Sequence, residues 1–170
     1  MVTNLDIFED LKYFENEGEK LKSDYLLYYY SKPDWSAIPR KVKIFIDKDY
    51  VFEVKLFWYK YPLKKRLVSS YKSNLLPDNI IEVLNEFNSL ENINLKELYC
   101  SKDEKYAPEG ISEDSYLINF NSKTISINMS SHWTDEKLFV SKEEILFLKL
   151  HKLLEQWKEK LYNDITKLHE

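Results

Sequence analysis

Histidines are among the side chains most often used for proton transfer and metal binding, and this chain has three of them. They are His132, His151 and His169. No two of them stand four residues apart on one helix, so the sequence lacks the histidine pair that is common in helix-borne zinc sites. We interpret each of the three as an imidazole at the surface or at the edge of the core.

The densest polar cluster is the stretch SSHWTDE at 130–136. It places serine, histidine and aspartate close together in sequence, but a catalytic relay is defined by the geometry of its members and not by their spacing. So tight a grouping is more typical of the exit from a strand, with Trp133 as an anchor. A hydrolase or small-molecule site near His132 therefore stays an alternative to the main prediction below.

Carboxylates, glycines and the single thiol give no stronger signal. Asp47 and Asp49 flank a lysine, which is typical of a hairpin turn, whereas a calcium loop needs more oxygen ligands and usually a glycine. The chain has only two glycines, which disfavours a phosphate-binding loop. Its one cysteine, Cys100, excludes an intramolecular disulfide and a multi-cysteine zinc site. We predict no metal, no cofactor and no enzymatic activity.

The stretch VFEVKLFWYKYPLKKRLVSSYK at 51–72 combines cations with aromatic residues. Residues 54–77 contain six lysines and arginines and no acid. Because the whole chain carries a net charge of −4, the residues outside this window carry −10. The charge of the chain is therefore strongly divided along the sequence.

Within this stretch, Phe57, Tyr59 and Tyr61 alternate onto the same strand face as Lys55. Aromatic rings beside lysines suit stacking on nucleic-acid bases and contacts to phosphates. They equally suit a protein interface with aromatic anchors and a charged rim. A third alternative is that a helix covers these rings, as in sheets with helices on both faces.

We predict a non-enzymatic protein that binds another protein. A bacterial immunity-type protein, or another inhibitor of a toxin or enzyme, fits the size and acidity, because an acidic inhibitor is steered towards a basic active site. Nucleic-acid binding through residues 55–72 is the alternative, weakened by the acidic remainder and by the scarcity of arginine. The predicted contact residues are Phe57, Tyr59, Tyr61, Lys64, Lys65 and Arg66, with the acidic residues Glu15, Glu17 and Glu19.

The strands that would position these side chains show a period of two. Residues 41–47 and 50–60 alternate on both sides of a short turn, which predicts an antiparallel hairpin. The aromatic residues 24–30 predict a strand before it, and residues 63–72 a third strand after it. We expect the core face of the hairpin to consist of Val42, Ile44, Ile46, Phe52, Val54, Leu56 and Trp58.

Helical periodicity appears in three segments. Residues 5–22 predict an amphipathic helix, and residues 76–90 predict another that Asp78 caps. The capping box from Ser141 to Glu144 begins a long C-terminal helix. Before that helix, the pattern of residues 116–130 predicts a second hairpin with polar residues outward.

These elements predict one α+β domain over residues 1–170, in which an antiparallel β-meander and hairpins pack with an N-terminal, a middle and a long C-terminal helix. The first residues contain acids where a secretory signal has basic residues, and no window reaches 18 uninterrupted apolar residues. We therefore expect a cytoplasmic protein with no membrane segment.

Overall fold

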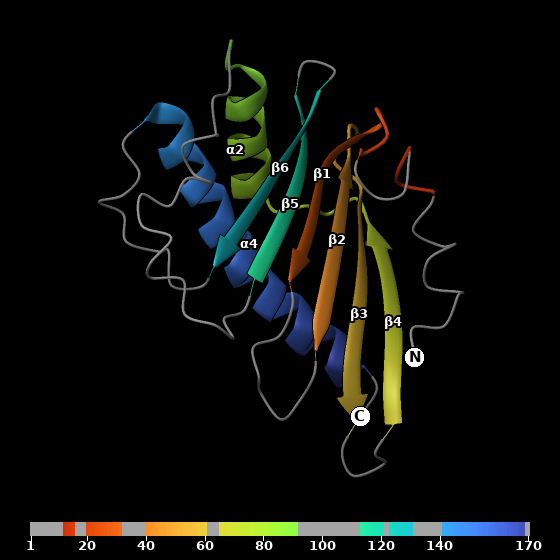
Figure 1. Ribbon diagram of the computed structural model, residues 1–170. Coiled ribbons are helices and arrows are strands. Elements are labelled where there is room, and N and C mark those ends of the chain that lie inside the picture. Colours follow the sequence, from red (N-terminus) through yellow and green to blue (C-terminus); the bar gives the residue numbers. More distant parts are fainter. Residues whose placement is uncertain are drawn as a thin grey trace, which may run out of the picture.

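The computed structural model describes residues 12–15, 20–31, 40–60, 65–91, 113–120, 123–130 and 141–168. These residues form one antiparallel sheet with two helices packed on it (Figure 1). The α+β class is confirmed. The predicted count of three helices is wrong, because the described residues contain two.

Six strands lie side by side in the order β4-β3-β2-β1-β5-β6, and every neighbouring pair is antiparallel. The meander from β1 to β4 forms one part of the sheet, and the hairpin of β5 and β6 joins the other side of β1. The strands β4 and β6 are therefore its edges. The strand bounds are Tyr25–Ser31 for β1, Lys41–Asp47 for β2, Phe52–Lys60 for β3, Lys65–Ser73 for β4, Glu113–Phe120 for β5 and Lys123–Ser130 for β6.

The predicted hairpin at 41–60 is present as β2 and β3, with Ile44 opposite Val54. All seven residues predicted for its core face are buried. In the turn between the two strands, Asp47 Oδ1 accepts hydrogen bonds of 2.9 Å from the backbone N–H groups of Asp49 and Val51. This local bonding confirms the interpretation of the two aspartates as turn residues.

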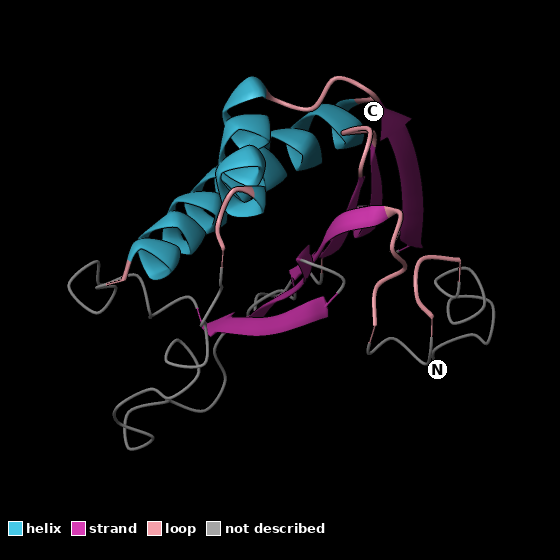
Figure 2. Ribbon diagram, turned by 90° about the horizontal axis from the view of Figure 1, so that it is seen from above, coloured by secondary structure: helices cyan, strands magenta, loops and turns pink. Residues whose placement is uncertain are grey.

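Both helices cover the same face of the sheet, as the view from above in Figure 2 shows. They are α2, Asp78–Asn88, and α4, Lys142–Lys167. Phe87 of α2 and Leu154 and Trp157 of α4 are buried in one cluster with the core face of the strands. Because burial of a large apolar side chain stabilises by roughly 1.5–3 kcal/mol, this cluster is the main stabilising layer of the described structure.

The two helices begin differently. Ser141 Oγ accepts from the Glu144 N–H at 3.1 Å and Glu144 Oε2 accepts from the Ser141 N–H at 3.0 Å, which confirms the capping box of α4. The predicted Asp78 cap of α2 is wrong. The extended residue Pro77 occupies the N-cap, so Asp78 is already in the first turn, where its charge still interacts favourably with the helix dipole. Within the described ranges, neither helix has the length and apolarity needed to cross a membrane.

The predicted helix at 5–22 is wrong over the residues that the structure describes. Phe14 and Leu21 instead form an antiparallel bridge, and the Lys22 N–H donates to the Tyr13 carbonyl at 2.8 Å. Tyr13, Phe14 and Leu21 are buried against Phe45 and Leu117 on the sheet face opposite the helices. Tertiary burial of these apolar residues therefore overrides their helical spacing.

Candidate functional site

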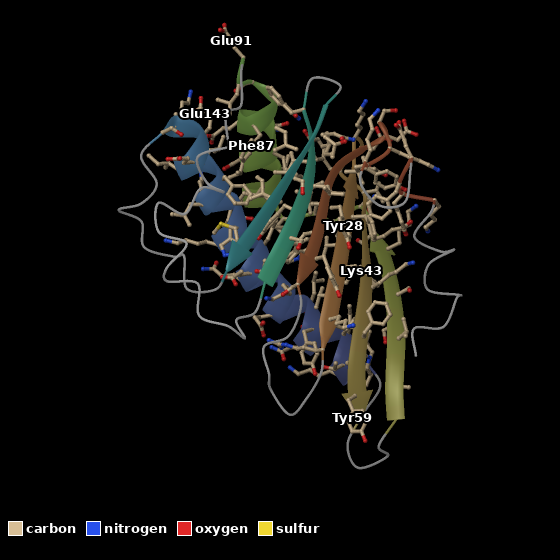
Figure 3. The ribbon with its side chains drawn as sticks, in the orientation of Figure 1. Tyr28, Lys43, Tyr59, Phe87, Glu91 and Glu143 are labelled. Atoms are coloured by element: carbon tan, nitrogen blue, oxygen red, sulfur yellow. The ribbon has the colours of Figure 1, made fainter. Side chains whose placement is uncertain are left out.

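The sheet face opposite α2 and α4, here called the open face, carries some of the aromatic residues and several lysines of β1 to β4. The strand register places Tyr30 beside Lys43, Lys43 beside Lys55, and Phe57 beside Val68. We call one part of this face the basic aromatic patch. It consists of Tyr30, Lys41, Lys43, Phe57, Tyr59 and Val68, and Figure 3 shows Lys43 near the middle of the sheet and Tyr59 at its lower end.

Lys43 is the charged centre of the patch. Its Nζ lies 5.8 Å from the ring centroid of Tyr30 and 5.7 Å from that of Phe57, within the range of cation–π attraction. Lys43 is half-buried, Lys41 is exposed, and Val68 is 59% exposed. The sequence prediction did not include Lys43, although its alternation with Val42 and Ile44 already placed it on the outer face.

The structure brings only part of the predicted contact residues together. Phe57 and Tyr59 lie on the open face and are both half-buried. Of the basic cluster, Lys65 and Arg66 begin β4, where the backbone of Arg66 pairs with Tyr59. Tyr61 and Lys64 lie outside the described residues.

Lys55 lies on the open face, as predicted, but it is only 7% exposed. Its Nζ lies 5.5 Å from the ring centroid of Tyr13. The Tyr13 ring stacks on Phe45 with a centroid distance of 3.6 Å and an interplanar angle of 12°. The described N-terminal residues 12–15 and 20–22, here called the N-terminal segment, therefore cover this part of the open face beside the basic aromatic patch.

Glu53 holds the N-terminal segment on the sheet. Its Oε2 accepts hydrogen bonds from the Tyr13 hydroxyl and, at 3.0 Å, from Lys12 Nζ, while Lys72 Nζ lies 3.2 Å from Oε1. Burial raises the pKa of Glu53, but these hydrogen bonds outweigh it and lower the pKa to about 2. A groove of about 550 Å³ lies here, with Lys55 and the residues of this network in its walls.

The predicted acidic surface is described in part. Glu15 is exposed and its Oε2 lies 2.8 Å from Lys20 Nζ, so it belongs to the N-terminal segment and not to the basic aromatic patch. Glu17 and Glu19 lie outside the described residues. The candidate hydrolase site near His132 also lies outside the described residues, because β6 ends at Ser130 and residues 131–140 are not described.

A second group of polar side chains is buried between the sheet and α4. Tyr29 of β1 donates to Asp114 Oδ2 at 3.0 Å, and the Tyr116 hydroxyl contacts His151 Nδ1. His151 Nδ1 lies 3.9 Å from Asp114 Oδ2, and His151 Nε2 lies 3.6 Å from Glu155 Oε2. We call these five residues the buried polar cluster.

Burial controls the ionisation of this cluster. Burial lowers the pKa of His151 even though the negative charge of Asp114 opposes the change. Burial, together with the nearby charge of Asp114, raises the pKa of Glu155 and of Tyr29. The imidazole is therefore neutral at neutral pH and has a lone pair to offer.

Asp114, His151 and Glu155 are the residues of the cluster that could hold a metal ion. Each offers one ligand atom, and these atoms lie within 4.8 Å of one another. The sequence prediction placed His151 at the surface or the core edge, whereas its side chain is 1% exposed. The spacing of His151 and Glu155, four residues apart on α4, was a signal for this pairing. Asp114 is distant in sequence, and it comes close to them only because β5 packs against α4.

Comparison with protein-family models and with curated proteins found no match.

Proposed function

We propose that the chain is a non-enzymatic binding protein whose basic aromatic patch binds an acidic segment of another protein. The observation that supports this most strongly is the position of Lys43 between the rings of Tyr30 and Phe57, on a sheet face that neither described helix covers. An ammonium group beside aromatic rings offers a partner both a charge and an apolar contact.

The patch combines an apolar anchor with a positive rim. Phe57 and Val68 are cross-strand neighbours on β3 and β4, and the aromatic side chain is the type that most often dominates interface energetics. Lys41 and Lys43 lie beside them on β2.

A protein partner is favoured over nucleic acid by the aliphatic part of the patch. Bases stack on aromatic rings, whereas the largely exposed Val68 offers apolar surface of a kind that protein interfaces use. An acidic segment of a protein, with carboxylates spaced by apolar residues, matches the patch more closely.

The test begins with capture of partners by the immobilised full chain from an extract of the source cells. Each captured protein is then purified, and its dissociation constant is measured for the wild type and for Phe57→Ala and Lys43→Gln. We expect Phe57→Ala to weaken binding at least about tenfold, as for an interface hot spot. Lys43→Gln should slow association and reduce the dependence of affinity on salt.

The matched controls are Ile145→Ala and Lys149→Gln, since both residues are exposed on α4. These variants should bind within about twofold of the wild type. Equal affinities for Phe57→Ala and Ile145→Ala would overturn the proposal. The wild type is also tested for binding to single- and double-stranded oligonucleotides at low salt. If it binds them and Lys43→Gln abolishes that binding, nucleic-acid binding replaces protein binding as the proposed function.

The prediction of an immunity-type protein or inhibitor of a toxin stays a prediction based on size and acidity, and it relies on the acidic remainder of the chain rather than on the basic aromatic patch. It requires that the captured partner is an enzyme or toxin, and that the chain inhibits it at stoichiometric concentration. A partner without any activity that the chain suppresses would contradict it.

A further inference from the structure

We propose that Asp114, His151 and Glu155 bind a divalent transition-metal ion such as Zn²⁺ between β5 and α4. One ligand atom from each lies within 4.8 Å of the others. Ligands of one such ion stand roughly 3–3.5 Å apart when each metal–ligand bond is about 2.0–2.2 Å. The 3.6 Å between His151 Nε2 and Glu155 Oε2 is close to this spacing, and the wider limit of 4.8 Å for the full set requires a small shift of the side chains towards the ion. This site differs from the sequence prediction that the chain holds no metal.

The strongest evidence is the ring nitrogen of His151 that faces Glu155. Among the described residues, Nε2 is buried and has no hydrogen-bond partner, and Glu155 Oε2 lies 3.6 Å from it. That distance is too long for a hydrogen bond but suits two ligands of the same ion. A metal between the two atoms would satisfy both at once, which explains why a neutral imidazole is buried beside two carboxyl groups.

The surrounding tyrosines hold the ligands as expected for a metal site. A metal-bound histidine usually donates its other ring N–H to a neighbouring group, which fixes the orientation of the ring. Tyr116 provides that contact at His151 Nδ1, and with the proton on Nδ1 the lone pair of Nε2 points towards Glu155. Tyr29 donates to Asp114 Oδ2 at 3.0 Å and so holds the second carboxylate.

The donor set selects the class of metal. One imidazole nitrogen and two carboxylates suit Zn²⁺ or Mn²⁺, whereas Ca²⁺ requires more oxygen ligands and Mg²⁺ retains most of its water. Three protein ligands leave the fourth position of a tetrahedral ion to water. The side chain of Glu155 is 37% exposed, which gives the ion access from solvent.

The test uses the full chain after removal of metal with EDTA. Zn²⁺ is titrated in competition with a chromophoric chelator, and thermal unfolding is followed with and without Zn²⁺. We expect one Zn²⁺ per chain and a higher unfolding temperature. Glu155→Gln should weaken Zn²⁺ binding more than tenfold, and Tyr116→Phe should weaken it about 10- to 100-fold. Mg²⁺ should not raise the unfolding temperature.

The matched control is Glu159→Gln, one turn along α4 from Glu155, where the carboxylate pairs with Arg40 at 2.5 Å. Its Zn²⁺ affinity should equal that of the wild type. Glu155 is partly exposed, so its substitution tests the site without disrupting the core, and far-UV circular dichroism checks the fold. The proposal is overturned if neither Zn²⁺ nor Mn²⁺ binds with saturation at one ion per chain. Equal Zn²⁺ affinities for Glu155→Gln and Glu159→Gln would also overturn it, because the ion would then sit elsewhere.

Discussion

Replacement of Glu53 by glutamine should release the N-terminal segment from the open face. The substitution keeps the size of the side chain but removes the charge that Lys12, Tyr13 and Lys72 share. We expect Glu53→Gln to lower the free energy of unfolding by about 2 kcal/mol at pH 7. The reason is that one partly buried carboxylate receives all three interactions.

Two routes lead to this magnitude. The lysine pairs are largely exposed, with side-chain exposures of 56% for Lys12 and 64% for Lys72, so each contributes about 0.2–1 kcal/mol. Exchange of the charge-assisted hydrogen bond from Tyr13 for a neutral one costs about 1 kcal/mol more. Independently, a pKa lowered from 4.5 to about 2 corresponds to roughly 3 kcal/mol before solvent screening, which reduces it to about 2.

The effect should depend on pH with a definite sign. The pKa of Glu53 is lower in the folded than in the unfolded chain, so its stabilisation is fully present above the unfolded value near 4.5. It is lost as the pH falls towards the folded value of about 2. The difference between wild type and Glu53→Gln should therefore be constant from pH 7 to pH 5 and shrink below pH 4.5.

Urea unfolding followed by tryptophan fluorescence measures this difference, because Trp58 and Trp157 are buried in the core. The matched control is Glu86→Gln, whose ion pair with Lys149 is exposed at both ends and 3.7 Å long. The control should change stability by less than about 0.5 kcal/mol. If Glu53→Gln is no less stable than Glu86→Gln at pH 7, or if its loss of stability persists unchanged at pH 3, the Glu53 carboxylate does not stabilise the fold in this way.

Two further predictions concern the helical layer. Ser141→Ala removes the N-cap side chain of α4 and should lower the free energy of unfolding by about 1 kcal/mol, which is a fall of about 2–4 °C in the thermal unfolding midpoint. An unchanged midpoint would show that the capping box contributes nothing to stability. Leu154→Ala opens a cavity at a side chain with 0% exposure and should cost about 3 kcal/mol in urea unfolding. Leu168→Ala, at 80% exposure, should cost less than about 0.5 kcal/mol, and equal losses for the two would contradict the placement of the core.

The parts of the fold that the sequence predicts are those that local patterns specify. The hairpin of β2 and β3 follows from strict alternation on both sides of an aspartate turn, and the Ser141 capping box marks the start of α4. The alternation also indicates which residues of β3 face outward. It does not indicate whether another segment covers them, and the structure shows that Tyr13 covers Lys55 while Phe57 stays half-exposed.

The parts that the sequence does not predict depend on contacts between distant segments. Residues 5–22 have apolar positions with helical spacing, yet in the described part of this range Tyr13 stacks on Phe45 and Phe14 forms a bridge with Leu21. Likewise, Asp114 and His151 meet because β5 lies under α4. A histidine beside a leucine stripe is predicted from sequence to lie at the surface or the core edge, and only the fold buries it and brings Asp114 close to it.

Carbodiimide coupling can show whether the open face contacts acidic residues of a partner protein. This zero-length reagent joins an amine to a carboxylate only where the two are in contact. In the complex of the full chain with its captured partner, mass spectrometry should find Lys41 or Lys43 joined to aspartate or glutamate of the partner. Intermolecular links from Lys149 or Lys160 of α4, without any from Lys41 or Lys43 of β2, would place the interface on the helical side of the sheet and contradict the proposed function.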